Sequence, residues 1–316
     1  MKKFIIILTL AIIGFVVVNN PLTEEYLTSL RIGNTEPVFL ASNSLYNEIE
    51  MRAKEYEIEP VDAKIDPIWK AIPGLNGLRV DIDASYRKMK NDQIFDENKL
   101  VFDEVSPQVH LSDLPPSPIY KGHPKKPMVS FIINVAWGND YLSEILTTLK
   151  KHHVKASFFL EGRWTKNNPE LAKMIASAGH EIGNHSYTHP DMKRLTSVRI
   201  REEIQKTNDV IKATTDTNPK WFAPPSGSYR DEVVRIAADE RLGTVMWSVD
   251  TIDWQKPSPD VLINRVISKI HNGALILMHP TESTAKALDD LIVQIKEKNL
   301  EIDTVSELLN ENNLRK

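Results

Sequence analysis

The stretch Gly179-His-Glu-Ile-Gly-Asn-His-Ser-Tyr-Thr-His-Pro190 joins a short apolar run to two closely spaced histidines. Glu181–Gly183 is typical of a buried strand, and His185 and His189 follow its carboxyl end. Because the histidines are four residues apart, one helical turn would place both imidazoles on one face. That spacing suits two ligands of a divalent metal. The pair alone is a weak signal, since histidines at this spacing are often unrelated.

Similar apolar runs alternate with amphipathic stretches over the C-terminal part of the chain. The expected strands are Val129–Val135, Ala156–Leu160, Glu181–Gly183, Trp221–Phe222, Thr244–Val249 and Ala274–Met278. The expected helices are Tyr141–His153, Pro169–Ala178, Ser197–Thr214, Glu232–Glu240, Pro259–His271 and a last one after a capping box that begins at Thr304. This alternation indicates an α/β domain with a parallel sheet, in either a barrel or a doubly wound form.

In both architectures functional residues collect just past the carboxyl ends of the strands. His279 follows the strand Ala274–Met278, where it could serve catalysis or simply the fold. Asp250, Asp253 and Trp254 follow the strand Thr244–Val249. These three residues could line a groove and orient a base, or they could form a solvated loop.

Taken in order, several stretches resemble the polysaccharide deacetylase family, the nodulation-factor deacetylase type of carbohydrate esterase family 4. They are Ala156-Ser-Phe-Phe-Leu160, Gly179–Pro190, Pro224-Pro-Ser-Gly227, Trp247-Ser-Val-Asp-Thr-Ile-Asp-Trp254 and Leu275-Ile-Leu-Met-His279. The second and fourth are the specific ones. The resemblance covers residues 129 to about 309 and implies a distorted (β/α) barrel. It also implies a metal-dependent hydrolase that cleaves the amide of N-acetylated sugars, such as those of peptidoglycan or chitin.

The resemblance assigns roles residue by residue. His185 and His189 would be two of three ligands to zinc or a similar divalent metal, and His279 would be the general acid. Asp250 or Asp253 would hold that histidine in orientation. The expected contacts to the sugar are Trp254, Pro225 and Ser226.

The sequence departs from the family where the family reads Thr-Phe-Asp-Asp-Gly. Here the same place reads Asn134-Val-Ala-Trp-Gly138, so Ala136 stands at the catalytic base and Trp137 at the third metal ligand. A family arginine that pairs with the catalytic aspartate has become Ala223. Loss of a general base alone typically removes about 10²–10⁴ of rate. We therefore expect weak or absent metal binding and impaired catalysis, unless Asn139 or Asp140 takes over a lost role. The alternative is a glycan-binding protein that does not catalyse.

The N-terminus predicts export. Lys2 and Lys3 precede the apolar run Phe4–Val18, as in a signal peptide or signal-anchor. An extracytoplasmic protein, either anchored in the membrane or secreted, is the expected result. The expected regions are 1–21, the signal segment; 22–40, a stalk; 41–105, a small α/β module; 106–127, a proline-rich linker; and 128–316, the deacetylase-like domain. The module has no motif, so a structural or partner-recruiting role for it is open.

Composition excludes several other classes of site. The chain has 316 residues, a formal net charge of −4 and no cysteine. Disulfides, thiolate metal ligands and a cysteine nucleophile are therefore excluded. A slightly acidic chain does not predict a nucleic-acid partner. The expected partners are a cell-wall glycan and, through the N-terminal segment, the membrane.

Topology can be tested directly on cells. Protease added to intact protoplasts should digest the protein, because the signal segment is expected to place the body of the chain outside. A cytoplasmic protein followed in the same sample is the control. Equal protection of both proteins would contradict export.

Overall fold

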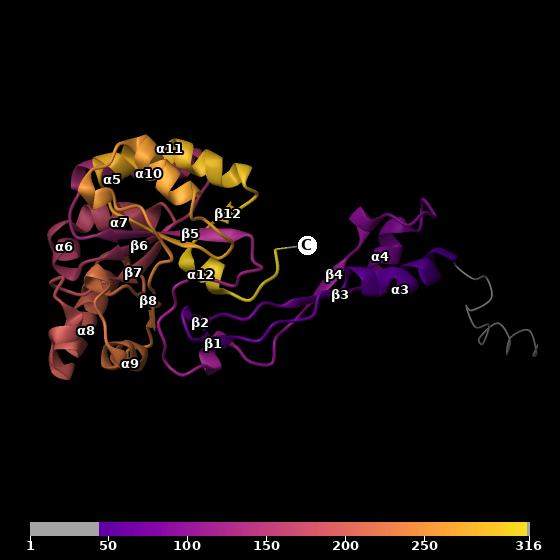
Figure 1. The fold of residues 1–316 in the computed structure, drawn as a ribbon, viewed down its shortest axis with the longest axis horizontal. Helices are drawn as coiled ribbons and strands as arrows, with labels where there is room; N and C mark the ends of the chain where they lie inside the picture. Colours follow the sequence, from indigo (N-terminus) through magenta and orange to yellow (C-terminus); the bar gives the residue numbers. More distant parts are fainter. Residues whose placement is uncertain (1–43, 315–316) are drawn as a thin grey trace, which may run out of the picture. The chain divides into compact units, whose positions relative to one another are not determined.

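The computed structural model describes residues 44–314 (Figure 1). Contacts within the chain divide it into two compact units. The smaller one ends at Lys54 and resumes over Ile82–Leu100, and the larger one comprises Glu55–Asp81 and everything from Val101 onward. The expected signal segment and stalk, 1–40, lie outside the described residues. None of the helices within 44–314 is both long and apolar enough to cross a bilayer.

The larger unit is built on a curled parallel sheet, which confirms the predicted α/β class. Its strand order is β10-β11-β5-β6-β7-β8-β9, and β12 also pairs with β5. The strands are β5 (Met128–Val135), β6 (Ser157–Leu160), β7 (Glu181–Asn184), β8 (Trp221–Phe222), β9 (Gly243–Thr244), β10 (Val249–Asp250), β11 (Leu275–Met278) and β12 (Glu301–Ile302). Every pairing within this sheet is parallel. All carboxyl ends therefore meet at one edge, as the sequence predicted.

Strand β5 is buried along all of its eight residues. Because side chains alternate across a strand, its two faces enter different cores. Residues such as Phe131 and Ile133 pack into the core beneath the helices. Met128 and Ile132 pack into a second core with Phe159 from β6. Asn134 has the same parity as Met128 and Ile132, so it lies at the carboxyl end of that second face.

Helices alternate with the strands and cover the outer face of the sheet (Figure 1). They are α5 (Asn139–Lys151), α6 (Gly162–Asn167), α7 (Pro169–Ser177), α8 (Ser197–Thr215), α9 (Asp231–Asp239), α10 (Pro259–Ile267), α11 (Glu282–Glu297) and α12 (Val305–Leu309). Most of the expected helices are confirmed to within two residues at either end. The exceptions are α10, which ends four residues early, and α6 and α11, which were not expected.

The expected strand Thr244–Val249 is wrong in its middle. It is two short strands, β9 and β10, and between them Val245 makes an isolated bridge to Ile119. Ile119 lies in a segment that the sequence assigned to a linker. Its amide donates to the carbonyl of Thr244 at 2.9 Å, and its carbonyl accepts from the amide of Met246 at 2.8 Å. Part of the expected linker 106–127 therefore pairs with the sheet.

The region 41–105 also divides differently from the expected module. Two antiparallel pairs, β1 (Lys64–Asp66) with β2 (Lys70–Ile72) and β3 (Gly77–Val80) with β4 (Phe102–Val105), belong to the larger unit. The smaller unit contains most of α3 (Ser44–Tyr56), together with α4 (Ile82–Met89) and η1 (Glu97–Lys99). Leu45, Ile49 and Ala53 are buried at helical spacing in α3. Helix α4 begins at Ile82, two residues after β3 ends at Val80.

Lys126, which lies just before β5, hydrogen-bonds to the end of the last helix, α12. Its side chain is only 1% exposed, and its Nζ donates to the carbonyl oxygens of Glu307 at 2.6 Å and Asn310 at 2.9 Å. A third bond at 2.6 Å reaches Oδ1 of Asn310. A cation is well placed here, since the last carbonyls of a helix lack partners within the helix. Burial nevertheless lowers the pKa of Lys126 to about 8.

Substitution Lys126→Met should lower the free energy of unfolding by about 3 kcal/mol, because the three oxygens that Lys126 binds lose their donor. Urea unfolding followed by circular dichroism measures this change. The neighbouring exposed lysine supplies the control, and Lys125→Met should change stability by less than about 0.5 kcal/mol. Equal stability of the two variants would show that the Lys126 contacts do not support the fold.

Candidate functional site

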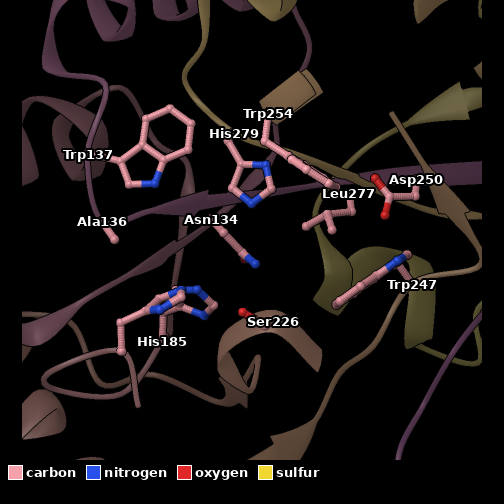
Figure 2. Close-up of a pocket in the computed structure, with 11 residues that line it drawn as sticks. Asn134, Ala136, Trp137, His185, Ser226, Trp247, Asp250, Trp254, Leu277 and His279 are labelled. Carbon is pink, nitrogen blue, oxygen red and sulfur yellow. The ribbon is translucent and has the colours of Figure 1, made fainter. Parts of the chain in front are cut away.

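A cavity of about 440 Å³ opens at the carboxyl ends of the central strands (Figure 2). It gathers residues that are far apart in the sequence and come from β5, β10, β11 and the loops after β5, β7, β8, β9, β10 and β11. The lining residues are Asn134, Ala136, Trp137, His185, His189, Ser226, Trp247, Asp250, Trp254, Leu277 and His279. Of the expected site residues, Pro225 is buried and Asp253 lies behind His279, and neither is among them.

The two expected metal-ligand histidines do meet, but not on a helix. Residues 185–189 form a loop in which Ser186 and His189 have positive φ angles of 61° and 55°. The rings of His185 and His189 lie edge to face with centroids 5.0 Å apart. The helical explanation of their spacing is therefore wrong. The loop turns through left-handed backbone, which brings residues four apart together by another route.

A carboxylate from α8 holds this loop. Glu203 is 2% exposed and accepts hydrogen bonds from the amides of Tyr187 at 2.9 Å and Thr188 at 2.7 Å. It also accepts one from the hydroxyl of Thr188 at 2.9 Å. Sequence reasoning missed Glu203, because a glutamate on a long helix is ordinarily solvated. Its only signal was its place within an otherwise apolar repeat that includes Ile200 and Ile204.

Burial keeps both histidines uncharged. His185 is 1% exposed, and burial followed by the nearby His189 lowers its pKa to about 3. Burial also lowers the pKa of His189. Nδ1 of His185 lies 2.7 Å from the carbonyl oxygen of Ala223, so this nitrogen carries the ring proton. Nε2 of His185 is consequently left as a hydrogen-bond acceptor.

His279, the residue expected to act as the acid, is hydrogen-bonded to one of the two candidate aspartates. Nδ1 of His279 lies 2.8 Å from Oδ1 of Asp253, which is fully buried. Oδ2 of Asp253 accepts from the amide of His279 at 2.6 Å and from the hydroxyl of Thr284 at 2.6 Å. Of the two candidate aspartates, Asp253 is thus the partner. Asp250 instead accepts from the amide of Ile252 at 2.8 Å and lines the cavity wall.

The indole of Trp137 lies beside this histidine with its plane nearly parallel to the imidazole. The rings of Trp137 and His279 are stacked, with centroids 5.7 Å apart and planes 10° apart, and the indole is 47% exposed (Figure 2). The following turn is fixed by Gly138, whose φ is 87° and whose added Cβ would lie 2.0 Å from the carbonyl oxygen of Pro280. Only glycine fits this turn. The path of the chain after Trp137 is therefore constrained.

The two expected replacement residues lie elsewhere. Asn139 accepts a hydrogen bond from Nε1 of Trp164 at 2.7 Å and donates to Asn168 at 2.9 Å. Asp140 is exposed in the first turn of α5, and neither residue lines the cavity.

Comparison with known proteins identifies the family to which this chain belongs. A family model described as polysaccharide deacetylase matches residues 121–245. The uncharacterized protein YlxY of Bacillus subtilis is 55% identical over 100% of this chain and 99% of its own length. A crystal structure of a CE4 family pseudoenzyme from Bacillus anthracis is 59% identical with a TM-score of 0.83, and the match covers 85% of this chain and 96% of that one. The chain belongs to the polysaccharide deacetylase family.

Relatives in this family differ in activity. The peptidoglycan-N-acetylmuramic acid deacetylase PdaA of Bacillus subtilis is 32% identical over 62% of this chain and 76% of its own length. A mutant of the Bacillus anthracis pseudoenzyme with restored enzymatic activity has also been solved, and it is 58% identical to this chain. The resemblance inferred from the sequence is thereby confirmed. The family therefore includes both enzymes and proteins described as pseudoenzymes.

The donor set does not fit the divalent metal of a polysaccharide deacetylase. Within residues 44–314 no group of three or more histidines, cysteines or carboxylates is placed to hold a metal ion. His185 and His189 supply two imidazoles, and the position of the third ligand is the indole of Trp137. An indole N–H donates hydrogen bonds and has no lone pair for a metal. No metal-dependent step can be derived from these residues.

Zinc binding tests this reading of the donor set. The wild-type protein should bind Zn²⁺ weakly, whereas Trp137→Asp should bind at least about tenfold more tightly because it returns a carboxylate beside the two histidines. Calorimetric titration of dialysed protein measures both. Trp254→Asp, which adds the same charge at the exposed rim, should behave as wild type. Tight stoichiometric zinc in the wild-type protein would contradict the expectation.

Proposed function

We propose that this protein binds N-acetylated cell-wall glycans in the substrate groove of a deacetylase without deacetylating them. One observation carries the proposal. The cavity and its acid half, His279 with Asp253, are kept, whereas Ala136 and Ala223 replace the base and its arginine. Trp137 stands at the position of a metal ligand, and its indole is offset-stacked with His279 at a centroid distance of 5.7 Å. The groove is therefore preserved, whereas the base, its arginine and one metal ligand of a deacetylase are replaced.

The loss of the base and the arginine together is physically consistent. Ala223 is 1% exposed, so an arginine there would be buried. A buried guanidinium without its carboxylate is an uncompensated charge, which typically destabilises a protein by about 3–5 kcal/mol. Once the aspartate was lost, replacement of the arginine removed that penalty. Ala136 and Ala223 together therefore remove the catalytic pair without leaving a buried, unpaired charge.

The rim of the cavity supports binding of sugars. Trp254 is 56% exposed, and Trp247 and Trp137 also line the cavity. Aromatic faces are large apolar platforms with little conformational entropy to lose, which suits packing against the apolar face of a sugar ring. Asp250 and Ser226 add hydrogen-bonding groups to the cavity lining. A hydrolase with a rearranged base is the second candidate, and Asp250 is the carboxylate in the cavity lining that could serve it.

The glycan and the cellular location follow from the relatives and from the N-terminus. The name of PdaA states that it acts on peptidoglycan, which lies outside the cytoplasmic membrane. The predicted export segment at Phe4–Val18 would deliver this chain to the same compartment. Peptidoglycan is therefore the glycan that we propose, with Ser226 and Trp254 kept as the predicted sugar contacts; Pro225 is buried outside the cavity lining and is not kept.

Acetate release measures the catalytic part of the proposal. The wild-type protein with added Zn²⁺ or Co²⁺ should release no acetate from N-acetylchitooligosaccharides or peptidoglycan fragments. The triple variant Ala136→Asp, Trp137→Asp, Ala223→Arg should raise the rate by at least about 10², whereas each single change should not, because the three groups act as a unit.

The control for this experiment is His279→Ala. Added to the triple variant, it should abolish the regained activity. Robust turnover by the wild-type protein that disappears in His279→Ala would overturn the proposal and establish a working hydrolase.

A further inference from the structure

The turn between β1 and β2 exposes large apolar side chains to solvent. Ile68 in the turn is 75% exposed, and Ile65 in β1 is 44% exposed. Trp69, which follows Ile68, is half-buried. Single exposed apolar residues are common in soluble proteins. Three large ones within residues 65–69 form a cluster, and clusters of this kind mark interaction sites.

The turn is held in one conformation by its own residues. Oδ1 of Asp66 accepts hydrogen bonds from the amides of Ile68 and Trp69, both at 2.8 Å. Lys70 closes the turn with a positive φ of 61°, and its Nζ donates to the carbonyl of Pro67 at 3.1 Å. A carboxylate that binds the amides just ahead of it in the chain stabilises a tight turn. The exposed isoleucine is therefore presented by a fixed tip.

Lysines surround this tip. Lys64 and Lys70 lie on the two strands of the hairpin itself. The ammonium of Lys121 lies over the ring of Trp69, 5.1 Å from its centroid. Lys125 is exposed in the segment that leads into β5. In a chain with a formal net charge of −4, this is a local concentration of positive charge.

The charges of these lysines act together on a buried histidine. The pKa of His123 is lowered to about 4, first by burial and then by four nearby lysines. These are Lys125, Lys64, Lys126 and Lys121. The carboxylate of Asp66 offsets part of the charge at Lys121. The fold thus gathers cations from distant parts of the sequence, and an anionic partner would relieve their mutual repulsion.

The tip lies at the amino ends of the barrel strands, whereas the cavity lies at their carboxyl ends. Lys121 forms a bridge with Ala274, the residue before β11. The ring centroid of Trp69 is 6.4 Å from that of His271, which precedes the same strand. Strand β5 has eight residues and spans roughly 26 Å at about 3.3 Å per residue. The tip and the cavity therefore belong to opposite ends of the sheet.

This combination of charge and apolar surface fits an anionic membrane. We propose that the β1–β2 tip, residues 64–70, docks on phospholipid headgroups together with Lys121 and Lys125. The ammonium groups bind lipid phosphates, Ile68 inserts at the boundary between headgroups and acyl chains, and Trp69 lies at the same interface. A soluble phosphate polymer would satisfy the lysines but would leave the isoleucine in water. The exposed apolar tip therefore favours a membrane.

Docking at this end would orient the glycan cavity. The predicted export segment Phe4–Val18 would place the chain on the outer side of the membrane, and the inference rests on that location. With the amino ends of the strands against the lipid, the cavity at the carboxyl ends opens toward the cell wall. The docking surface adds a second partner to the proposed glycan and gives the glycan-binding site its direction.

A fluorescent label at the tip tests docking in the full-length protein. The chain has no cysteine, so Ile68→Cys provides a unique attachment point for an environment-sensitive dye. Val198→Cys is the control position, since that valine on α8 is 67% exposed. The labelled proteins are mixed with vesicles of phosphatidylglycerol and phosphatidylcholine, or of phosphatidylcholine alone, each carrying a spin-labelled lipid as quencher. The dye at position 68 should be quenched on the anionic vesicles only, and the dye at position 198 on neither.

Two pairs of charge variants measure the electrostatic part. In the Ile68→Cys protein, Lys64→Gln with Lys125→Gln should lower the ratio of lipid-quenched to unquenched dye at least about tenfold, because each lysine near an anionic surface contributes about fivefold. Lys166→Gln with Lys206→Gln removes two exposed lysines from α6 and α8 and should leave the ratio unchanged.

Ile65→Ser measures the apolar part. It should lower the same ratio about threefold, because less apolar surface enters the interface. Val261→Ser on α10, where the valine is 49% exposed, should not change the ratio. An effect of the lysine pair without an effect of Ile65→Ser, with soluble polyphosphate binding the wild type, would assign the lysines to a soluble phosphate polymer and overturn membrane docking.

The remaining outcomes are equally decisive. Equal quenching at positions 68 and 198, equal quenching on neutral and anionic vesicles, or no quenching at position 68 would each overturn the inference. Binding of N-acetylchitotetraose should be the same in the wild type and in every tip variant, because the tip lies away from the cavity. Loss of glycan binding in the wild type would instead overturn the proposed function and leave the docking result standing.

Discussion

Burial of β5 on both faces is the constraint on which the rest of this structure depends. One face packs under the helices through residues such as Phe131 and Ile133, and the other packs inside the curl of the sheet through Met128 and Ile132. A strand held on both sides cannot slip in register without burying or exposing a whole set of side chains. Its carboxyl end is therefore placed accurately, and so are Asn134, Ala136 and Trp137. Gly138 then fixes the exit, since any Cβ would meet Pro280 at 2.0 Å.

Most of the fold could be predicted from the sequence because its core strands are short, continuous apolar runs between amphipathic helices. Two elements escaped for physical reasons. The run Thr244–Val249 looks like one strand, but Ile119 pairs with its middle through hydrogen bonds to Thr244 and Met246. Long-range pairing of this kind leaves no local pattern. Helix α11 was missed although Leu288, Leu291, Ile292 and Ile295 follow helical spacing and are buried, so there the signal was present.

The candidate site was predictable in its residue types and only partly in its geometry. The order of the motifs predicted that His185, His189, His279 and Asp250 lie together. The structure places all four in the lining of one cavity. The choice between Asp250 and Asp253 could not be made from the sequence, because it depends on which carboxylate the β10 loop turns toward His279. The sequence did not indicate that the indole of Trp137 would lie nearly parallel to the ring of His279. Asn134 was visible as a polar residue at the end of an apolar strand. Only the structure shows that it is buried and that its Oδ1 has no hydrogen-bond partner.

The carboxylate of Glu203 binds the amides of Tyr187 and Thr188 from a neighbouring helix, at 2.9 and 2.7 Å. The loop that carries the two histidines is consequently shaped by the protein framework and does not need an ion to hold it. In many metalloproteins the ion organises its own ligands, and its loss unravels the site. Here the hydrogen bonds that shape the histidine loop come from Glu203 and are independent of a bound metal ion. A lineage could lose the metal without losing the pocket, remain folded while selection acted on recognition alone, and still keep the imidazoles in register for a later return of the ion.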